Sequence, residues 1–255
     1  MTKTATLGVM TAIPEEIEDL GAAFTEEGRE VVAGLVFRRG VLEGRRCVLV
    51  ETGIGKVNAA IVATLLISRF GCDGLVFSGV AGGLDPALGV GDVVIATRLI
   101  AHDYGALIDG DIRPYQPGVP PLPGFDETVG YDIDAAVLGR LRPVLDGIDL
   151  PTLSSEAAGG EPRTPSVHFG TVLTGDTFMN CGATRERLFN RFGGLAVEME
   201  GAAVAQTADR FGVPVVVIRA LSDLAGADSH VDFGAFVHET AAVAAGIVRQ
   251  VVGHL

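Results

Sequence analysis

Cysteine is scarce in this sequence, with three residues in 255. Cys47, Cys72 and Cys181 are odd in number, widely spaced and without a CxxC pair, which argues against a disulfide framework and against a zinc site. The five histidines include no HxH or HxxxH pair, the usual spacings of histidine ligands. We therefore expect no metal and a reducing, cytoplasmic location.

Basic charge is also in short supply, and no segment suits a membrane. The formal net charge is −13 and the pI is near 4.7, so most of the surface repels a phosphate backbone. The apolar piece of MTKTATLGVMTAIPEE is too short to span a bilayer, and Pro14, Glu15 and Glu16 stand where a signal peptide needs small residues. We expect neither nucleic acid nor membrane as a partner.

Short apolar runs alternate with helical periodicity along the chain. With 48% hydrophobic residues, the chain can bury a full core, and we expect a single domain over residues 1–255. Several runs are apolar at consecutive positions, as in central strands that helices cover on both faces. The expected strands are 5–12, 47–52, 74–78, 93–97, 170–173 and 213–221, and the expected helices are 15–24, 57–70, 133–145, 184–192, 201–211 and 233–252. The pattern predicts an α/β layered fold.

Three segments depart from that alternation. Residues 31–39 and 45–52 are expected to form a hairpin, whose antiparallel pair would make the sheet mixed. Residues 106–128 are rich in proline and residues 154–165 read SSEAAGGEPRTP; both are expected to be long loops. Composition favours flexibility for the second, whereas the aromatic side chains of the first suit a cover over a site.

Charged residues stand inside apolar runs at two places. Glu198 and Glu200 lie in AVEMEGAAVAQ, and Arg219 interrupts VPVVVIRALSD shortly before Asp223. Because buried charges need partners, we expect these acids to share a polar pocket with Arg219, and Glu16 is a further candidate. A purely structural ion-pair network explains the same residues equally well, so the residues alone leave the choice open.

Two glycine-rich stretches follow expected strands. In GVAGGLDP, Gly79, Gly82 and Gly83 allow the backbone to approach a ligand closely, although glycines also simply form turns. TGIGK looks like a phosphate loop, but the pattern GxxxxGK followed by Ser or Thr fails, because Val50 and Val57 occupy the required positions.

The motifs, taken in order, resemble the 5'-methylthioadenosine/S-adenosylhomocysteine nucleosidases of the nucleoside phosphorylase superfamily. They are AIPEE, ETGIGKVNAA, GVAGGLDPALGVGDVVIA, TGDTFMN, AVEMEGAAVAQ, FGVPVVVIRALSD and DSHVDF. The resemblance covers both ends of the chain and leaves out mainly the two long loops. It implies a three-layer α/β/α fold with a central mixed β-sheet, no cofactor and a homodimer. It also implies hydrolysis of the bond between adenine N9 and C1' of a 5'-alkylthio ribose.

The resemblance further implies roles for two acids. Asp223 matches the general acid that protonates adenine N7, and Glu16 matches the base that activates water, in the two-carboxylate logic of glycosidases. Glu200 matches the carboxylate that accepts hydrogen bonds from the ribose hydroxyls, and Met199 the residue that contacts the sugar. Arg219 is expected to hold Glu16 ionised.

The same comparison implies the rest of the nucleoside site. Phe178 matches the aromatic residue that stacks on adenine, with Met179 beside it, and Ser222 helps to place the acid. Phe233 matches a residue of the apolar pocket for the 5' substituent. Near Gly82, Val80 stands where many bacterial members have Ser, which removes a hydroxyl close to the water and the ribose.

Two rival functions and several substrates remain. A purine nucleoside phosphorylase needs a cation for phosphate, and the first loop offers Pro14, Glu15 and Glu16 instead. A non-catalytic nucleoside-binding protein would not need both Glu16 and Asp223. Methylthioadenosine, S-adenosylhomocysteine, 5'-deoxyadenosine and a 6-amino-deoxyfutalosine-type nucleoside stay open as main substrate, because the segment after Asp103 is longer than in compact bacterial members.

Overall fold

The computed structural model describes residues 5–119, 128–158, 160–225 and 233–255, with the side chains of residues 15, 16, 19 and 233–238 outside that description. The strands are β1 (Thr6–Thr11), β2 (Thr25–Val32), β3 (Leu35–Leu42), β4 (Arg45–Glu51), β5 (Gly74–Gly83), β6 (Val93–Ala101), β7 (Gly105–Ile108), β8 (Asp111–Pro114), β9 (Tyr131–Asp132), β10 (Val167–Thr174), β11 (Ala196–Glu198) and β12 (Val215–Asp223). The helices are α1 (Pro14–Ala23), α2 (Lys56–Ser68), α3 (Ala135–Leu145), α4 (Ser155–Ala158), α5 (Gly182–Phe192), α6 (Gly201–Phe211) and α7 (Phe233–His254).

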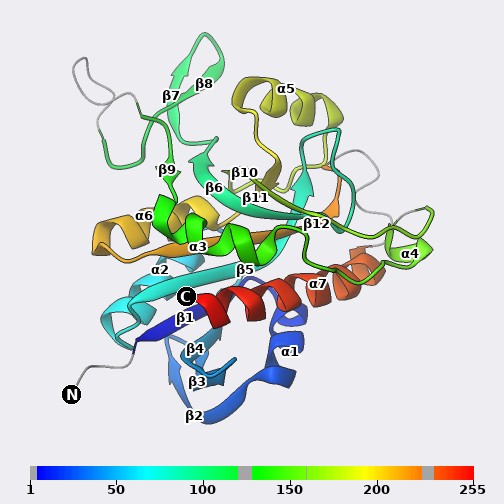
Figure 1. The fold of residues 1–255 in the computed structure, drawn as a ribbon. Helices are drawn as coiled ribbons and strands as arrows, with labels where there is room; N and C mark the ends of the chain where they lie inside the picture. The colour runs from blue at the N-terminus through cyan, green and yellow to red at the C-terminus, as the bar shows by residue number, and fades with distance from the viewer. Residues whose placement is uncertain (1–4, 120–127, 159, 226–232) are drawn as a thin grey trace.

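The expected three-layer α/β/α arrangement is confirmed (Figure 1). One face of the sheet packs against α1, α3 and α7 in an apolar core that includes Leu20, Leu141 and Val248. The other face packs against α2 and α6 in a second core. Within the described part of the chain, no helix is long and apolar enough to cross a membrane.

The sheet is mixed, and it closes on itself at one side. Its order is β11-β10-β6-β12-β5-β1-β4-β3-β2, with β9 added to β6. In addition, β11 pairs antiparallel with β5, where Val197 faces Gly82 and Ala196 faces Gly83. Because β12 and β6 also run antiparallel, the strands of this sheet do not all end at the same edge. The closure is what brings the end of β11 to the end of β12.

The expected hairpin is wrong in its first strand. Residues 31–39 straddle a turn between β2 and β3, where Ala33 and Gly34 have φ of 51° and 81°. The second turn, at Glu43 and Gly44, lies where it is expected and joins β3 to β4. Two successive hairpins therefore extend the sheet, and the positive φ that glycine tolerates marks both turns.

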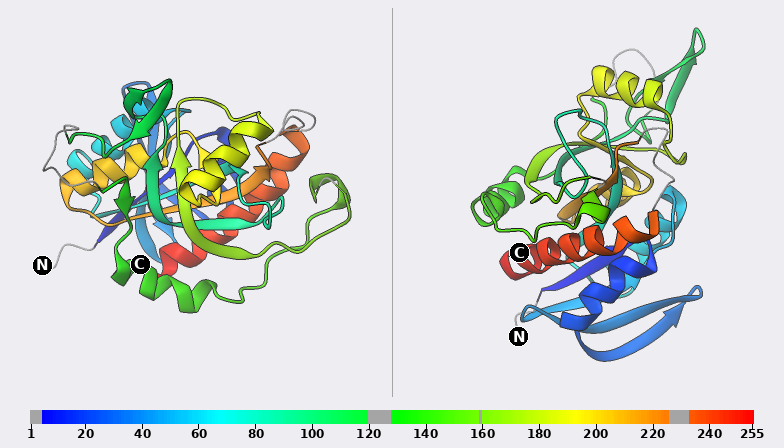
Figure 2. Two further views of the ribbon diagram at one scale, coloured as in Figure 1. Left: turned by 90° about the horizontal axis from the view of Figure 1, so that it is seen from above. Right: turned by 90° about the vertical axis from the view of Figure 1, so that its right-hand side faces the viewer.

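The expected long loops are wrong in part. Residues 105–114 form the hairpin of β7 and β8, which projects from the body (Figures 1 and 2). Its turn is Asp109-Gly110, a dipeptide that favours tight hairpins. The second segment contains α4, and Arg163 binds Asp92 at 3.0 Å. Residues 120–127 and 159 lie outside the described residues.

Helix α2 is only partly buried, although its sequence predicts deep packing. Ala59, Val62 and Leu66 are fully buried, whereas the side chains of Val57 and Ile61 are 71% and 46% exposed. An apolar helix with an exposed apolar face is typical of a surface that contacts another molecule.

Candidate active site

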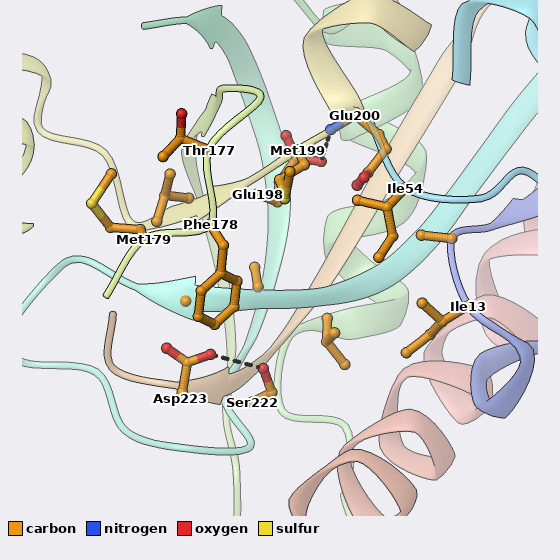
Figure 3. A pocket seen from close by; sticks show the side chains of 15 residues that line it. Ile13, Ile54, Thr177, Phe178, Met179, Glu198, Met199, Glu200, Ser222 and Asp223 are labelled. Atoms are coloured by element: carbon orange, nitrogen blue, oxygen red, sulfur yellow. Dashed lines mark hydrogen bonds between the residues drawn. The ribbon is translucent and has the colours of Figure 1, made fainter. Parts of the chain in front are cut away.

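A cavity opens where β1, β5, β11 and β12 end, beside the loops that follow β4 and β10 (Figure 3). Side chains from all six places meet there. They are Ala12, Ile13, Ile54, Val80, Ala81, Gly82, Thr177, Phe178, Met179, Val197, Glu198, Met199, Glu200, Ser222 and Asp223. Eight of the eleven residues that the sequence assigned to a site line this one cavity.

Asp223, the last residue of β12, is held by its own neighbours. Its Oδ1 accepts a hydrogen bond from the Ala225 backbone N–H at 2.6 Å, and its Oδ2 lies 3.1 Å from the Ser222 hydroxyl, which donates to it. Gly82 lies directly across on β5, where a Cβ would approach Asp223 Oδ1 to 3.2 Å. The glycine therefore leaves room for the carboxyl group.

The two glutamates of AVEMEG do different things. Glu198 is buried and its Oε2 lies 2.5 Å from Arg219 Nη2; the same oxygen accepts from the backbone N–H groups of Glu200 and Gly201 at 3.1 and 2.7 Å. Its other oxygen accepts from the Thr174 hydroxyl. Glu198 thus neutralises Arg219 and satisfies the first N–H groups of α6, a favourable place for a carboxylate.

Glu200 turns its carboxylate toward the cavity (Figure 3). Its Oε1 accepts from the Gly55 N–H at 2.8 Å, and Arg219 Nη2 lies 3.5 Å from its Oε2. Glu200 is 4% exposed and Arg219 is fully buried, with its guanidinium 4.1 Å from the centre of the Phe77 ring. Arg219 is absent from the described cavity lining but contacts both glutamates. It therefore positions their carboxylates without lining the cavity itself.

The Gly55 contact is a feature that the sequence reasoning missed. The stretch TGIGK was excluded as a phosphate loop, yet its backbone holds the carboxylate of Glu200 and its Ile54 lines the cavity. The two glycines of this stretch were the sequence signal for such a backbone contact. Gly53 and Gly55 both adopt the positive φ that glycine tolerates.

The loop after β10 supplies the aromatic side of the cavity. Phe178 is 47% exposed and its ring points toward the strand end that carries Ser222 and Asp223 (Figure 3). Met179 and Thr177, its neighbours in the chain, also line the cavity, as does Met199, which directly follows β11. A flat, accessible aromatic ring in an apolar cavity suits a planar heterocycle.

Two assigned residues have side chains outside the described residues, namely Glu16 and Phe233. The backbone places Glu16 in the first turn of α1, directly after Ala12 and Ile13, which line the cavity. Phe233 begins α7. Val80 lines the cavity at the position where a serine was expected from the family.

Acidic residues, and no basic ones, are found among the described residues that line the cavity. The acidic residues of the lining are Glu198, Glu200 and Asp223. Within the described part of the chain, no group of three or more His, Cys, Asp or Glu side chains gathers to hold a metal.

Comparison with known proteins decides the family. The family model of the phosphorylase superfamily matches residues 6–253. The 5'-methylthioadenosine/S-adenosylhomocysteine nucleosidase of Mycobacterium tuberculosis is 51% identical over 247 residues, which cover 97% of this chain and 96% of that protein. The chain belongs to this nucleosidase family. The Bacillus subtilis member is 38% identical over 247 residues, 96% of this chain and 97% of the relative.

Solved structures of the nucleosidase family share the fold. The Streptococcus pneumoniae enzyme with the transition-state inhibitor MT-ImmA superposes with a TM-score of 0.82, at 30% identity, covering 98% of this chain and 99% of the other. A futalosine hydrolase of Helicobacter pylori superposes with a TM-score of 0.80, at 28% identity, covering 99% of each chain. Membership of the nucleosidase family makes the chain an N-glycosyl hydrolase.

Proposed function

We propose that the chain hydrolyses the N-glycosidic bond of 5'-methylthioadenosine and S-adenosylhomocysteine, releasing adenine and the 5-alkylthioribose. The observation that supports this most directly is the convergence of Asp223, Glu200 and Phe178 on one cavity. An acid, a ribose-binding carboxylate and an adenine-stacking ring are three of the groups that the reaction needs. Curated relatives over nearly the whole chain carry that activity in their names.

In the proposed mechanism Asp223 protonates adenine N7. The Ala225 N–H can only donate, so Oδ1 acts as an acceptor; we assign the proton to Oδ2, whose partner is the Ser222 hydroxyl, a group that can donate or accept. As the proton moves to N7, the C1'–N9 bond breaks and its electron pair goes to adenine, so the sugar gains oxocarbenium character. Glu200 binds the ribose hydroxyls and keeps C1' in place.

Glu16 takes the second role in this proposal. Water attacks C1' and gives a proton to Glu16, so that Asp223 ends ionised and Glu16 ends protonated. Two carboxyl groups in opposite protonation states thus complete hydrolysis without a covalent intermediate. This role is supported by Ala12 and Ile13, which line the cavity and lie just before the first turn of α1.

Replacing Asp223 tests the acid. We expect Asp223→Asn to lower turnover about 100-fold or more, because removing a general acid typically costs that much, while nucleoside binding persists. Steady-state release of adenine and calorimetric binding of methylthioadenosine measure the two effects. Asp146→Asn, an exposed change at the end of α3, is the matched control. Undiminished turnover in Asp223→Asn would remove Asp223 from the mechanism. An aspartate-to-asparagine mutant of the Helicobacter pylori nucleosidase holds 5'-methylthioadenosine in its active site, which supports the expected binding.

A phosphorylase is the nearest rival, and the charge of the cavity argues against it. Phosphate would have to enter beside the carboxylate of Glu200, with no Lys or Arg among the described lining residues, and like charges repel. We expect adenine release to be independent of phosphate. Formation of ribose 1-phosphate derivatives would overturn hydrolysis in favour of phosphorolysis.

Comparison of kcat/KM among the candidate nucleosides identifies the preferred substrate. The likeness to a futalosine hydrolase makes 6-amino-deoxyfutalosine a competitor of the two thioethers and of 5'-deoxyadenosine. We expect the thioethers to give the highest kcat/KM. A preference of about tenfold or more for the futalosine-type nucleoside, or about 1.4 kcal/mol, would reassign the substrate.

We propose that the enzyme is a cytoplasmic homodimer that serves methionine salvage. Val57 and Ile61 leave an apolar face on α2, and Leu107 on β7 is 75% exposed; such faces are usually covered. All three cysteines are free, in keeping with a reducing compartment. Sedimentation equilibrium should give twice the chain mass, and a monomer at micromolar concentration would contradict the proposal.

A further inference from the structure

A cluster of three charged side chains joins the loops that carry the nucleoside-binding residues. Lys56 begins α2, Asp103 follows β6 and Asp176 follows β10. Lys56 Nζ lies 2.6 Å from Asp103 Oδ1 and 3.4 Å from Asp176 Oδ2. The backbone N–H of Lys56 donates to Asp176 Oδ1 at 3.0 Å, and the backbone N–H of Asp176 donates to Asp103 Oδ2 at 2.8 Å. One ammonium and two N–H groups therefore tie three loops together.

The neighbours of this cluster are the residues that face the ligand. Gly55, directly before Lys56, donates its N–H to Glu200. Thr177 and Phe178, directly after Asp176, line the cavity. A shift of either loop would move the proposed ribose carboxylate relative to the proposed adenine ring. The cluster itself is absent from the described cavity lining, so any effect on binding passes through its neighbours.

The choice of lysine is informative in this chain. Of 19 basic residues, only Lys3 and Lys56 are lysine. Other ion pairs of the described residues that use a guanidinium or ammonium use arginine, as at Arg98 with Asp132 and Arg219 with Glu198. A compact ammonium with three donors can bridge two carboxylates from different directions, which a planar guanidinium fork does less readily.

The pKa of Asp103 and the burial of the pair both indicate that the ion pair between Lys56 and Asp103 is stronger than a surface pair. Burial acts to raise the pKa of the Asp103 carboxyl, but hydrogen bonds from Lys56 and from the Asp176 N–H outweigh burial, and the pKa lies below its usual value. Asp103 and Lys56 are about one quarter exposed, so the pair is shielded from solvent more than a surface salt bridge.

We propose that Lys56 is a positioning residue for the nucleoside: by joining Asp103 and Asp176, it fixes the loop of Phe178 against the loop whose Gly55 N–H holds Glu200. The inference rests on the proposed function, because it assigns the two loops to ribose and adenine. It adds a residue outside the cavity that acts through two residues inside it.

The test replaces the charge and then restores it. We expect Lys56→Met to raise KM for methylthioadenosine about tenfold while kcat changes less than about threefold, the pattern of lost binding shared by ground and transition states. Lys56→Arg, which keeps the cation, should bring KM back to within about threefold of the wild type. Arg249→Met, which breaks the exposed pair with Glu43 far along α7, is the matched control and should leave both constants unchanged.

A second readout does not depend on catalysis. Hydrogen exchange at the Gly55 amide should be faster in Lys56→Met than in the wild type, because the bond to Glu200 loosens. An unchanged KM together with unchanged exchange at Gly55 would overturn the inference, even if thermal stability fell. Should the wild type release no adenine from any nucleoside, the proposed function fails, and calorimetric binding of adenine with exchange at Gly55 still decides whether Lys56 positions the loops.

Discussion

At the scale of single residues, the site depends on the absence of a side chain at Gly82. The sequence predicted that Gly82 lets backbone approach a ligand from a loop. The structure places Gly82 inside β5, paired with Asp223 on β12 and Val197 on β11. An added Cβ would lie 3.0 Å from Ala225 Cβ and 3.2 Å from Asp223 Oδ1. The glycine makes space for the acid, and sequence alone gave no means of seeing the two strands side by side.

Gly82→Ala tests this reading. The new methyl group should push Asp223 and Ala225 by a few tenths of an ångström, and misplacement of a reacting group is costly, so we expect kcat to fall about tenfold or more. Gly139→Ala, where an added Cβ meets nothing within 4 Å, should keep kcat. Steady-state adenine release measures both. Wild-type turnover in Gly82→Ala would show that the carboxyl group needs no such space.

The sequence predicted only some of the contacts between charged residues. The apolar runs around Arg219 and Glu198 predicted that they share a buried network, and the structure confirms their contact at 2.5 Å. The assignment of Glu200 to the Gly55 N–H could not be foreseen, because it joins residues 145 positions apart through loop geometry. The periodicity of apolar residues indicates which residues are buried, but it does not indicate which loops contact each other.

At the scale of elements, composition misjudged the segment 154–165. Its small and polar residues predicted a flexible loop, but α4 forms there and Leu153 bridges to Arg163. The buried carboxylate of Asp92 accepts from Arg163, from the Ser166 N–H at 2.8 Å and from the Gly89 N–H at 2.9 Å. Asp92, directly before β6, thus orders this segment through its hydrogen bonds, although the segment itself has few apolar residues that could pack into a core.

We expect Asp92→Ala to lower the free energy of unfolding by about 3 kcal/mol, since the backbone N–H groups of Gly89 and Ser166 lose their buried acceptor. Asp132→Ala breaks the pair with Arg98, in which the aspartate side chain is 62% exposed, and should cost less than about 1 kcal/mol. Urea unfolding of the two variants measures the difference. Equal losses would mean that Asp92 contributes no more than a surface pair.

At the scale of the whole molecule, alternating apolar runs were enough to predict the layers but not the closure of the sheet. The strands of the central sheet, such as β5 and β12, are buried on both faces as their continuous apolar runs require. The pairing of β11 with β5 was missed because β11 has three residues, too few for a periodic signal. One continuous sheet also fits a single domain over residues 1–255, which stays a prediction.

A half-buried histidine makes the stability of the whole chain sensitive to acid. His102 follows β6, and its Nε2 has no hydrogen-bond partner among the described residues. Burial lowers the pKa of His102, opposed by the nearby Asp103 and Glu198 and reinforced by Lys56 and Arg187. In the unfolded chain a histidine titrates near pH 6.5, so below about that pH the unfolded chain binds a proton that the folded chain resists. This contribution to stability is therefore complete above about pH 6.5 and is lost as the pH falls toward the lower, folded-state pKa.

We therefore expect the urea midpoint of the wild type to fall between about pH 7.5 and about pH 5.5. His102→Gln, which cannot titrate, should lose less over the same interval, whatever its stability at neutral pH. Carboxyl groups contribute equally to both proteins, so the difference between the two slopes isolates the histidine. Parallel slopes would mean that His102 titrates alike in the folded and unfolded chains, and that the fold does not keep its imidazole neutral.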